Sequence, residues 1–395
     1  MKLLYIAYKI EKNKGSEDGP GYHVAELLTQ HMDQMTIISR RNNIEKLKQD
    51  PAFARTRLIS VDVPKILYFY KKKGRGIILY YYLWQVMVGL MVRKMQKQQQ
   101  FDVIHQMNFH ATWAPHFIFS KTARIIWGPL TQHPSIPLAF WYDGKKALLG
   151  EWAKRVVKAY FLTLDPFLKW AIRRSHRIIL GQEQVTGAYN AARSRIVTIP
   201  QARSCFPVAQ GKTVTEAFTI LFIGRFISLK GIIPALQAIE QFRAALPQGK
   251  RDQVKTIIIG EGPLEQQIKR FDHVEVLPWQ EQSALLHYYQ QASVFLFPSF
   301  EGQGLVVAEA LSQGCPVLCL RNTGPHSVAG NAALTVSAAG KDQLVKDLAN
   351  QLHHLSTEYW QNSEIYQHYV QQSLTRAAYL TWPRMTQEVM EQYHG

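Results

Sequence analysis

The stretch PSFEGQGLVVAEALSQGCPV, residues 298–317, indicates how the second half of this chain folds. The segment before it, SVFLF at 293–297, is a short apolar run that predicts a buried strand. After Gly304, apolar residues at positions 305, 308 and 311 have helical spacing, and Gly314 and Pro316 are typical of a helix end. We therefore expect a strand, a glycine-containing loop and a helix.

Two carboxylates lie eight positions apart in this stretch. Glu301 falls in the predicted loop beside Gly302 and Gly304, and Glu309 falls inside the predicted helix. Glycine lets a ligand approach the backbone closely, and the free N–H groups of a helix start favour an anion. Two glutamates at this spacing are also typical of a solvated helix face. The strand, the glycines and the abrupt helix start favour a nucleotide-sugar site, with one carboxylate for a sugar and one for a ribose.

A second motif, TILFIGRFISLKG at 219–231, precedes the first. Its apolar strand is expected to end at Gly224, with Arg225 and Lys230 in the next loop and a helix starting near Gly231. Ligands bind at the C-terminal ends of strands in open α/β sheets. Arginine offers a planar fork to phosphate oxygens, and lysine offers a mobile point charge. Unless they are ordinary surface cations, Arg225 and Lys230 would neutralise a diphosphate leaving group.

Together the two motifs resemble the retaining glycosyltransferases of family 4. That family has a G-R-x-x-x-x-K-G loop, then two glutamates separated by seven residues, and both patterns occur here in that order. GSEDGPGYHVAELL at 15–28 and RIIWGPL at 124–130 resemble one bacterial branch of it. The resemblance implies an α/β chain with the GT-B fold, in which two Rossmann-like parallel-sheet domains face a cleft. It implies Glu301, Arg225 and Lys230 as catalytic residues, and Gly21, Gly224, Gly302, Gly304 and Glu309 as donor-binding residues.

Acceptor binding is expected of polar side chains that follow strands of the first half. His105, Asn108 and His133 are the candidates, although a structural hydrogen bond is an equally good reading of each histidine. The family resemblance does not name a catalytic base, because Gly128 and Pro129 stand where many members have a histidine. Gln303 stands where many members have an aromatic residue, which leaves the donor sugar open.

The alternation of strands and helices predicts parallel sheets in two domains. We expect an N-terminal Rossmann-like acceptor-binding domain at 1–200, a linker at 201–216, a C-terminal Rossmann-like nucleotide-sugar-binding domain at 217–379, and a helix at 380–395 that returns to the first domain. The predicted strands are 1–8, 35–39, 57–62, 102–106, 123–127, 177–180, 195–199, 218–223, 255–259, 273–277, 293–297 and 316–320.

Positive charge is concentrated in the first half of the 395-residue chain. The formal net charge is +17, and residues 1–200 hold 31 of the 46 Lys and Arg but only 13 of the 29 Asp and Glu. Such asymmetry indicates a polyanionic partner. Basic residues flank an aromatic, apolar run at 76–92, and cations interleave with apolar residues at 151–177, which favours an anionic membrane surface over nucleic acid. A buried helix explains the run at 76–92 equally well. The basic residues before that run are Lys71, Lys72, Lys73 and Arg75.

These features lead to one expected function. The chain would transfer a sugar, with retention, from a nucleotide-diphosphate donor to a glycan or lipid-linked acceptor in bacterial cell-surface polysaccharide or lipopolysaccharide synthesis. It would act in the cytoplasm, peripherally on the inner face of the membrane, since no signal peptide is recognisable. No cofactor is expected, and the absence of an Asp-x-Asp motif predicts metal independence. The alternatives are a soluble glucosyltransferase acting on a sugar or sugar phosphate, a nucleic-acid-binding protein and a non-catalytic lectin-like protein.

Overall fold

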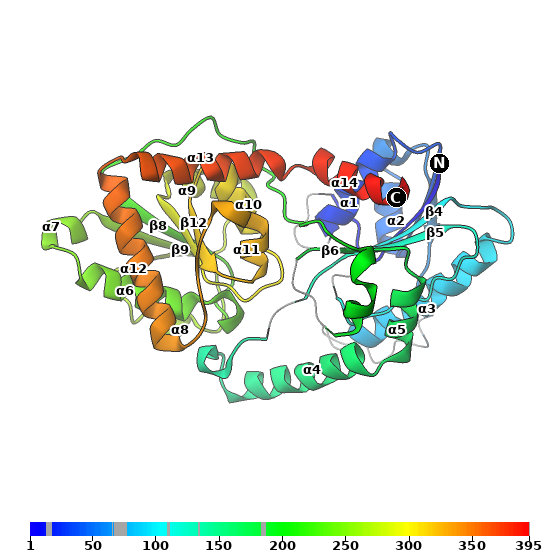
Figure 1. Cartoon of the computed structure of the whole chain (residues 1–395), viewed down its shortest axis with the longest axis horizontal. Coiled ribbons are helices and arrows are strands. Elements are labelled where there is room, and N and C mark those ends of the chain that lie inside the picture. Colours follow the sequence, from blue (N-terminus) through cyan, green and yellow to red (C-terminus); the bar gives the residue numbers. More distant parts are fainter. Residues whose placement is uncertain are drawn as a thin grey trace. The chain divides into compact units, whose positions relative to one another are not determined.

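The computed structural model describes residues 1–12, 18–64, 66, 77–108, 111–132, 135–182 and 187–394. Its contacts divide the chain into two units, each with its own parallel sheet (Figure 1). The segments 133–153 and 202–216 both group with the second unit, although the first lies within the N-terminal half of the sequence. Unit 1 comprises Met1–Gln132, Lys154–Gln201 and Trp382–Gly395, and unit 2 comprises His133–Ala153 and Ala202–Thr381.

The described part of unit 1 contains a seven-stranded sheet in the order β3-β2-β1-β4-β5-β6-β7, with every pair parallel. Leu3 of the central strand pairs with Met35 on one side and Val103 on the other. The strand order reverses between β1 and β4, so the chain winds outward from the middle of the sheet in both directions. The strands are β1 (Lys2–Ala7), β2 (Gln34–Ser39), β3 (Arg57–Ser60), β4 (Val103–Asn108), β5 (Arg124–Leu130), β6 (Arg177–Leu180) and β7 (Ile196–Thr198).

Successive residues of β1 enter different apolar clusters, because strand side chains alternate between the two faces of a sheet. Leu3 and Tyr5 join one cluster with residues of α1, α2 and α14, whereas Leu4 and Ile6 join another with residues of α3. Both faces of the sheet are therefore covered by helices. The helices of unit 1 are α1 (Asp18–Leu28), α2 (Arg41–Leu47), α3 (Ile77–Met95), α5 (Pro166–Arg174), α14 (Trp382–His394) and the second part of α4 (Lys145–Thr163), with 3-10 turns η1 (Pro51–Phe53) and η4 (Gly187–Arg195).

Helix α3 packs one face into the apolar core of unit 1 and leaves another face partly exposed, so both readings of the run at 76–92 stay open. Trp84 is completely buried, and its indole N–H donates to the carbonyl of Val61 at 2.8 Å. Leu79 and Leu90 remain exposed. In the part of the chain that the structure describes, no helix combines the length and apolar character needed to cross a bilayer. The basic residues 71–75 lie outside the described residues.

Unit 2 contains, in its described part, a six-stranded parallel sheet in the order β10-β9-β8-β11-β12-β13. Here the order reverses between β8 and β11, where Val294 pairs with Ile220 and Phe295 pairs with Leu221. The last strand, β13, was not predicted from the sequence. The strands are β8 (Phe218–Ile223), β9 (Val254–Ile259), β10 (Glu275–Leu277), β11 (Val294–Phe297), β12 (Val317–Leu320) and β13 (Ala333–Val336).

Among the helices of unit 2, α6 packs against α8 and α12, and α10 packs against α9, α11 and α13 (Figure 1). The 202–216 segment packs on this unit, since Ala202 is buried in its core and the Ala209 N–H donates to Ser312 O at 2.8 Å. The helices are α6 (Ile232–Ala244), α7 (Gln248–Arg251), α8 (Glu265–Ile268), α9 (Gln282–Gln291), α10 (Leu305–Ser312), α11 (Gly324–Ala329), α12 (Lys341–Trp360) and α13 (Glu364–Tyr379), with 3-10 turns η3 (Leu138–Phe140), η5 (Ser228–Lys230) and η6 (Gly330–Ala332).

Candidate functional site

The predicted donor residues lie where the strand order of unit 2 reverses. Strands β8 and β11 are neighbours there, and their C-terminal ends lead into the loops at 224–231 and 298–304. Open α/β sheets bind ligands at this kind of reversal, because loops that leave in opposite directions open a crevice between them. The structure thus brings the two sequence motifs together at one edge of one sheet.

Gly231 fixes how closely the two loops approach. It has a φ of +69°, which side chains rarely adopt, and a Cβ atom there would lie 2.0 Å from the carbonyl oxygen of Pro298. Only glycine satisfies both the backbone angle and this close approach. The turn η5, which ends in Lys230, is therefore held directly against the loop that carries Glu301.

Lys230 and Glu301 form an ion pair between the two loops. The Lys230 ammonium also lies 5.1 Å from the centroid of the Phe297 ring. Burial raises the pKa of Glu301 above its ordinary value, although the neighbouring Lys230 charge lowers it. The second carboxylate oxygen of Glu301, Oε1, is buried and has no hydrogen-bond partner among the described residues. A buried acceptor without a donor is costly, so this oxygen is suited to a ligand hydroxyl.

The other predicted donor residues of the first loop are less constrained. Arg225 is exposed at the start of the loop, directly after Gly224. A Cβ atom at Gly224 would make only ordinary contacts, the nearest being 3.6 Å from the Phe297 ring. Glycine at 224 is therefore not required by packing within the protein, because a Cβ atom there would touch its neighbours without a clash.

The loop before α10 is supported by α11. Gly324 donates its N–H to the carbonyl of Glu301 at 2.8 Å, and a Cβ atom on Gly324 would lie 2.1 Å from the carbonyl carbon of Gly302. Gly304 is the N-cap of α10, and its carbonyl accepts from the Val307 N–H at 3.0 Å. The helix thus begins in the loop that follows the C-terminal end of β11, next to the strand that leads to Lys230.

Glu309 is almost completely buried in α10 and is bonded to side chains of α9. Its Oε1 accepts from the Gln282 amide at 2.7 Å, and its Oε2 accepts from the Tyr289 hydroxyl at 2.8 Å. Burial raises the pKa of Glu309, and these two hydrogen bonds lower it. A carboxylate has about four lone-pair sites, so two remain for hydroxyl donors of a ligand. Glu301 and Glu309 therefore differ, since only the first has an unpartnered oxygen.

Of the three acceptor candidates, only His105 has a side chain that the structure describes. His105 is completely buried, with Nε2 2.7 Å from the carbonyl oxygen of Gly128 and Nδ1 2.7 Å from the Tyr393 hydroxyl. Because a carbonyl only accepts, Nε2 carries the proton, and burial lowers the pKa of His105 to about 4. His105 thus makes the structural hydrogen bonds of a neutral histidine, which is one of the two readings that the sequence left open. Asn108 ends β4 with an undescribed side chain, and His133 lies outside the described residues.

Gly21 lies within α1 rather than at its start, because the helix begins at Asp18. It is buried, and its carbonyl accepts a hydrogen bond from the Tyr5 hydroxyl at 3.0 Å. The contact joins α1 to the central strand of unit 1. Residues 13–17 of the same loop lie outside the described residues.

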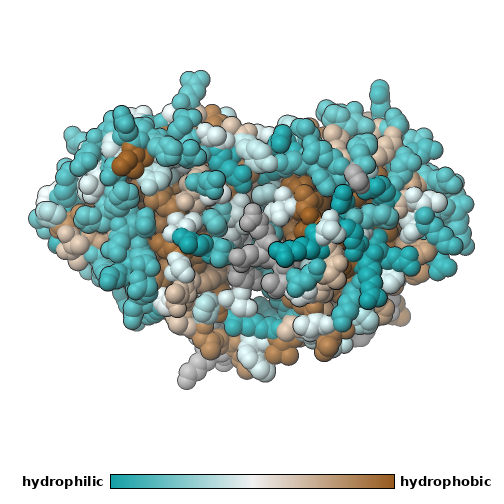
Figure 2. Space-filling model, viewed as in Figure 1, coloured by the Kyte–Doolittle hydropathy of each residue, from teal (hydrophilic) through white to brown (hydrophobic). Residues whose placement is uncertain are grey.

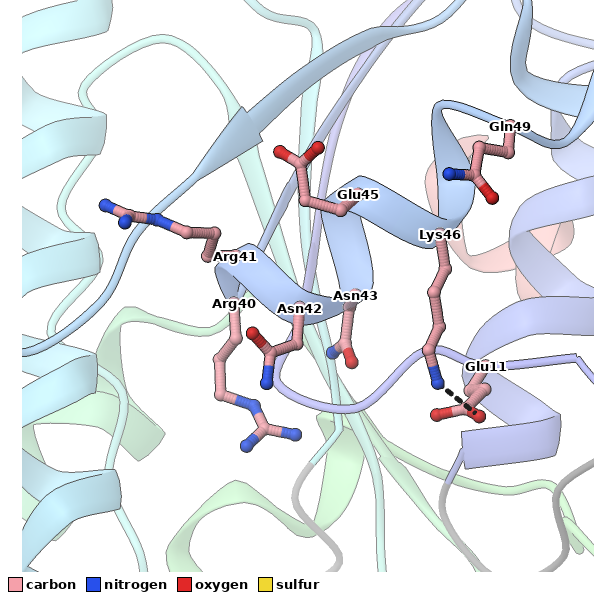
Figure 3. A pocket seen from close by; sticks show the side chains of 8 residues that line it. All are labelled: Glu11, Arg40, Arg41, Asn42, Asn43, Glu45, Lys46 and Gln49. Carbon is pink, nitrogen blue, oxygen red and sulfur yellow. Dashed lines mark ion pairs between the residues drawn. The ribbon is translucent and has the colours of Figure 1, made fainter.

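Unit 1 carries a polar hollow of about 510 Å³ beside α2 (Figure 3). Glu11 and Lys46 form an ion pair across it at 2.6 Å, and the Arg40 and Asn43 side chains both donate to the carbonyl of Tyr8 at 3.0 Å. These bonds connect the ends of β1 and β2. The hollow therefore has a structural explanation. Its lining residues belong to unit 1, whereas Lys230 and Glu301 belong to unit 2.

Several residues of the donor site were missed by sequence reasoning. Gln282 and Tyr289 bind Glu309 from α9, and Gly324 supports the Glu301 loop from α11. Each lies outside the two motifs. The helical spacing of seven residues that puts Gln282 and Tyr289 on one face of α9 is a signal, but a common one.

Comparisons with known proteins show which proteins this chain is similar to. Residues 217–358, which include both motifs, match the family model described as glycosyl transferases group 1. The O-antigen chain mannosyltransferase B of Escherichia coli is 27% identical over 235 residues, which cover 54% of this chain and 58% of that protein. This chain thus matches less than two thirds of the relative's length.

Solved structures match along the whole chain. HepE from Anabaena, in complex with UDP, has a TM-score of 0.60 at 14% identity, with 100% of both chains covered. WaaG, a glycosyltransferase involved in lipopolysaccharide biosynthesis, has a TM-score of 0.56 at 12% identity, again with 100% of both covered. The chain has the GT-B fold. The predicted α/β fold class of two parallel-sheet domains is confirmed.

Proposed function

We propose that this protein is a retaining glycosyltransferase that moves a sugar from a nucleotide-diphosphate donor to a glycan or lipid-linked acceptor. The unpartnered, buried Oε1 of Glu301 beside Lys230 carries the proposal. It offers an acceptor for sugar hydroxyls within reach of a cation suited to the leaving diphosphate. The match of residues 217–358 to glycosyl transferases group 1 supports the same assignment.

Each residue of the candidate site would have a separate role in sugar transfer. Lys230 and Arg225 would hold negative charge on the departing diphosphate, helped by the N–H groups at the start of α10. Glu301 would bind donor-sugar hydroxyls and stabilise positive charge that develops at the anomeric carbon. Glu309 would accept hydrogen bonds from the ribose. A lysine ammonium has three donors, so Lys230 can contact Glu301 and a phosphate oxygen together.

A donor screen tests the proposal. Purified protein would be incubated with UDP-glucose, GDP-mannose and ADP-glucose, and release of nucleotide and the configuration of the sugar product would be followed by NMR. We expect turnover of one donor, with the product keeping the donor's anomeric configuration. An inverted product would contradict retention, and failure to bind or cleave any nucleotide sugar would contradict the glycosyltransferase itself.

Turnover is expected to survive removal of divalent metal ions. Arg225 and Lys230 supply the positive charge that other enzymes obtain from Mg²⁺ or Mn²⁺, and the chain has no Asp-x-Asp motif to hold such an ion. Activity with the donor selected by the screen would be measured before and after EDTA treatment. Loss of activity that is restored on adding back Mg²⁺ or Mn²⁺ would refute the prediction.

The names of the relatives suggest the pathway in which the protein acts, and an exposed surface of unit 1 suggests that it acts at a membrane. The O-antigen and lipopolysaccharide names of the similar proteins suggest cell-surface polysaccharide synthesis. On unit 1, Tyr160, Leu164 and Phe167 of the α4–α5 region are each more than half exposed. Figure 2 shows apolar and hydrophilic residues next to each other over α4. Exposed aromatic and aliphatic side chains among cations suit the interface of an anionic membrane, where a lipid-linked acceptor would lie.

Binding of the protein to vesicles is expected to require acidic lipid and to fall with salt. Replacing Lys154, Lys158, Lys169 and Arg173 by glutamine should release it, because each cation near such a surface contributes about 1 kcal/mol, screened beyond about 10 Å at roughly 0.1 M salt. Sedimentation with anionic and with zwitterionic vesicles measures this. The matched control replaces four exposed cations of unit 2: Lys250, Lys255, Lys269 and Arg270.

If the unit 2 control lost binding as strongly as the α4–α5 variant, net charge alone would explain membrane association. If wild type ignored lipid charge, the exposed surface of α4 and α5 would have no role in membrane binding. The second result would favour a soluble sugar or sugar-phosphate acceptor.

A further inference from the structure

The segment 135–143 belongs to unit 2 although it precedes that unit's first strand by many residues. Ile136 and Phe140 are buried in the apolar core of unit 2, and Trp141 packs against the same core. The Phe140 ring lies 5.4 Å from the ring of Phe300, the residue immediately before Glu301. One end of the segment therefore contacts the loop that carries the proposed sugar-binding carboxylate.

The other end of the segment bonds to the proposed diphosphate loop. The Ser228 N–H donates to both carboxylate oxygens of Asp143, at 3.0 and 3.2 Å. In return, the Ser228 hydroxyl oxygen accepts from the N–H groups of Tyr142 and Asp143, at 2.7 and 3.2 Å. Ser228 is the first residue of η5, which ends in Lys230. The pairing thus holds the loop from Arg225 to Lys230 at its midpoint.

This pairing supplies what the loop's own sequence lacks. The N-cap position of η5 is Ile227, which has no polar side chain to accept from the first N–H of the turn. Serine, threonine, asparagine or aspartate at an N-cap normally accepts from one N–H of the first turn. Here Asp143, far away in sequence, accepts in its place. A turn without that cap would leave a half-buried N–H unsatisfied and its geometry poorly fixed.

Tyr142 holds the segment on two further helices of unit 2. Its carbonyl accepts from the Gln267 amide of α8 at 3.2 Å, and the Lys341 ammonium of α12 lies 5.3 Å from its ring centroid. Asp143 therefore follows a residue that is held by both α8 and α12. A fixed carboxylate can keep η5 in place when a ligand arrives, which a mobile one could not.

We propose that Asp143 is a positioning residue of the donor site: it caps η5 and so sets the place of Lys230 and Arg225 against the donor diphosphate. That the ligand is a donor diphosphate rests on the proposed function. The contacts between Asp143 and Ser228 do not depend on it. Asp143 touches neither the diphosphate nor the sugar. It acts through the Ser228 backbone. A shift of about 1 Å in a group that stabilises charge can lower the rate of catalysis strongly.

Hydrogen exchange tests the geometry without any substrate. In Asp143→Ala, the amide of Ser228 and its neighbours in η5 should exchange at least tenfold faster than in wild type, while amides of β8 stay unchanged. Asp143→Asn keeps a side-chain oxygen that can accept from Ser228 N–H and should exchange nearly as slowly as wild type. Unchanged exchange of η5 in Asp143→Ala would overturn the capping role.

Kinetics with the donor selected by the screen test the function. Asp143→Ala should lower kcat/KM roughly 5- to 30-fold, the factor that corresponds to one or two kcal/mol, with a raised donor KM. Asp143→Asn should recover most of the loss. The control Asp252→Ala removes an exposed unit 2 carboxylate that makes one side-chain hydrogen bond, and it should match wild type.

The asparagine variant separates positioning from charge. If Asp143 affected the donor only through its negative charge near phosphate, alanine and asparagine would both lower the donor KM, which would overturn the proposal. Equal losses in the alanine and asparagine variants would overturn it too. A wild-type protein that turns over no nucleotide sugar would instead overturn the proposed function, and hydrogen exchange would still decide whether Asp143 caps η5.

Discussion

Replacing Lys230 with methionine is expected to lower kcat/KM for the nucleotide-sugar donor roughly 100- to 1,000-fold, about 2.7–4 kcal/mol of transition-state stabilisation. Lys230 is the cation that the fold brings against Glu301, and it lies at the C-terminal edge of the sheet where β8 and β11 meet. Methionine keeps an unbranched side chain and removes the charge. Arg225→Ala should fall in the same range, because Arg225 starts the same loop.

The control for Lys230 is Lys269→Met. Lys269 is an exposed lysine of unit 2 whose ammonium lies 3.2 Å from Glu265, so its loss removes an ion pair without touching the proposed site. Its turnover should match wild type. Losing Lys230 also leaves Glu301 as a buried carboxylate without its cation, which destabilises the fold. The double variant Lys230→Met/Glu301→Gln removes that cost, so thermal melting of both variants separates folding from chemistry. Normal turnover by Lys230→Met or Arg225→Ala at saturating donor would remove that residue from the site.

The strand and helix pattern of this chain could be predicted because both units are built from short apolar strands separated by helices. The strand before residue 298 and the helix after Gly304 are found as β11 and α10. Strand β13 was missed because ALTV at 333–336 is short and follows directly on a turn. Helix α3 stayed ambiguous because an apolar, aromatic run of its length suits either a core or an interface, and Gln85 within it is buried.

The grouping of the candidate site residues in unit 2 could be expected from the sequence because they lie in two local motifs. Arg225, Lys230, Glu301 and Glu309 occur in loops and a helix that follow strands β8 and β11, and strand neighbours bring them together. Their partners could not be predicted in the same way. Asp143 bonds to Ser228 across 85 positions of sequence, and no local pattern marks such a pair. The placement of residues 133–153 in unit 2 likewise depends on contacts that only the folded chain shows.

Substitution of Glu309 is expected to affect nucleotide binding, whereas substitution of Glu301 is expected to affect the sugar-transfer step. Glu309→Gln should weaken binding of the free nucleoside diphosphate roughly tenfold or more, because its ribose partner is present in the nucleotide alone. Glu301→Gln should leave that binding nearly unchanged, because its sugar partner is absent, yet lower kcat roughly 100-fold or more. Isothermal calorimetry with UDP, GDP and ADP, and turnover at saturating donor, measure the two effects.

Glu309 needs a control for its structural bonds, because Gln282 and Tyr289 both donate to it. Tyr289→Phe removes one of those bonds and keeps the carboxylate. If Glu309 binds the ribose directly, Tyr289→Phe should retain most of the nucleotide affinity even where its melting temperature falls, since a carboxylate that loses one internal donor can still accept from a ribose hydroxyl. Equal losses of nucleotide affinity in Glu309→Gln and Tyr289→Phe would mean that Glu309 acts only by holding α9 to α10. Equal losses in Glu301→Gln and Glu309→Gln would mean that the two carboxylates share one ligand group, and the assignment of sugar to one and ribose to the other would be wrong.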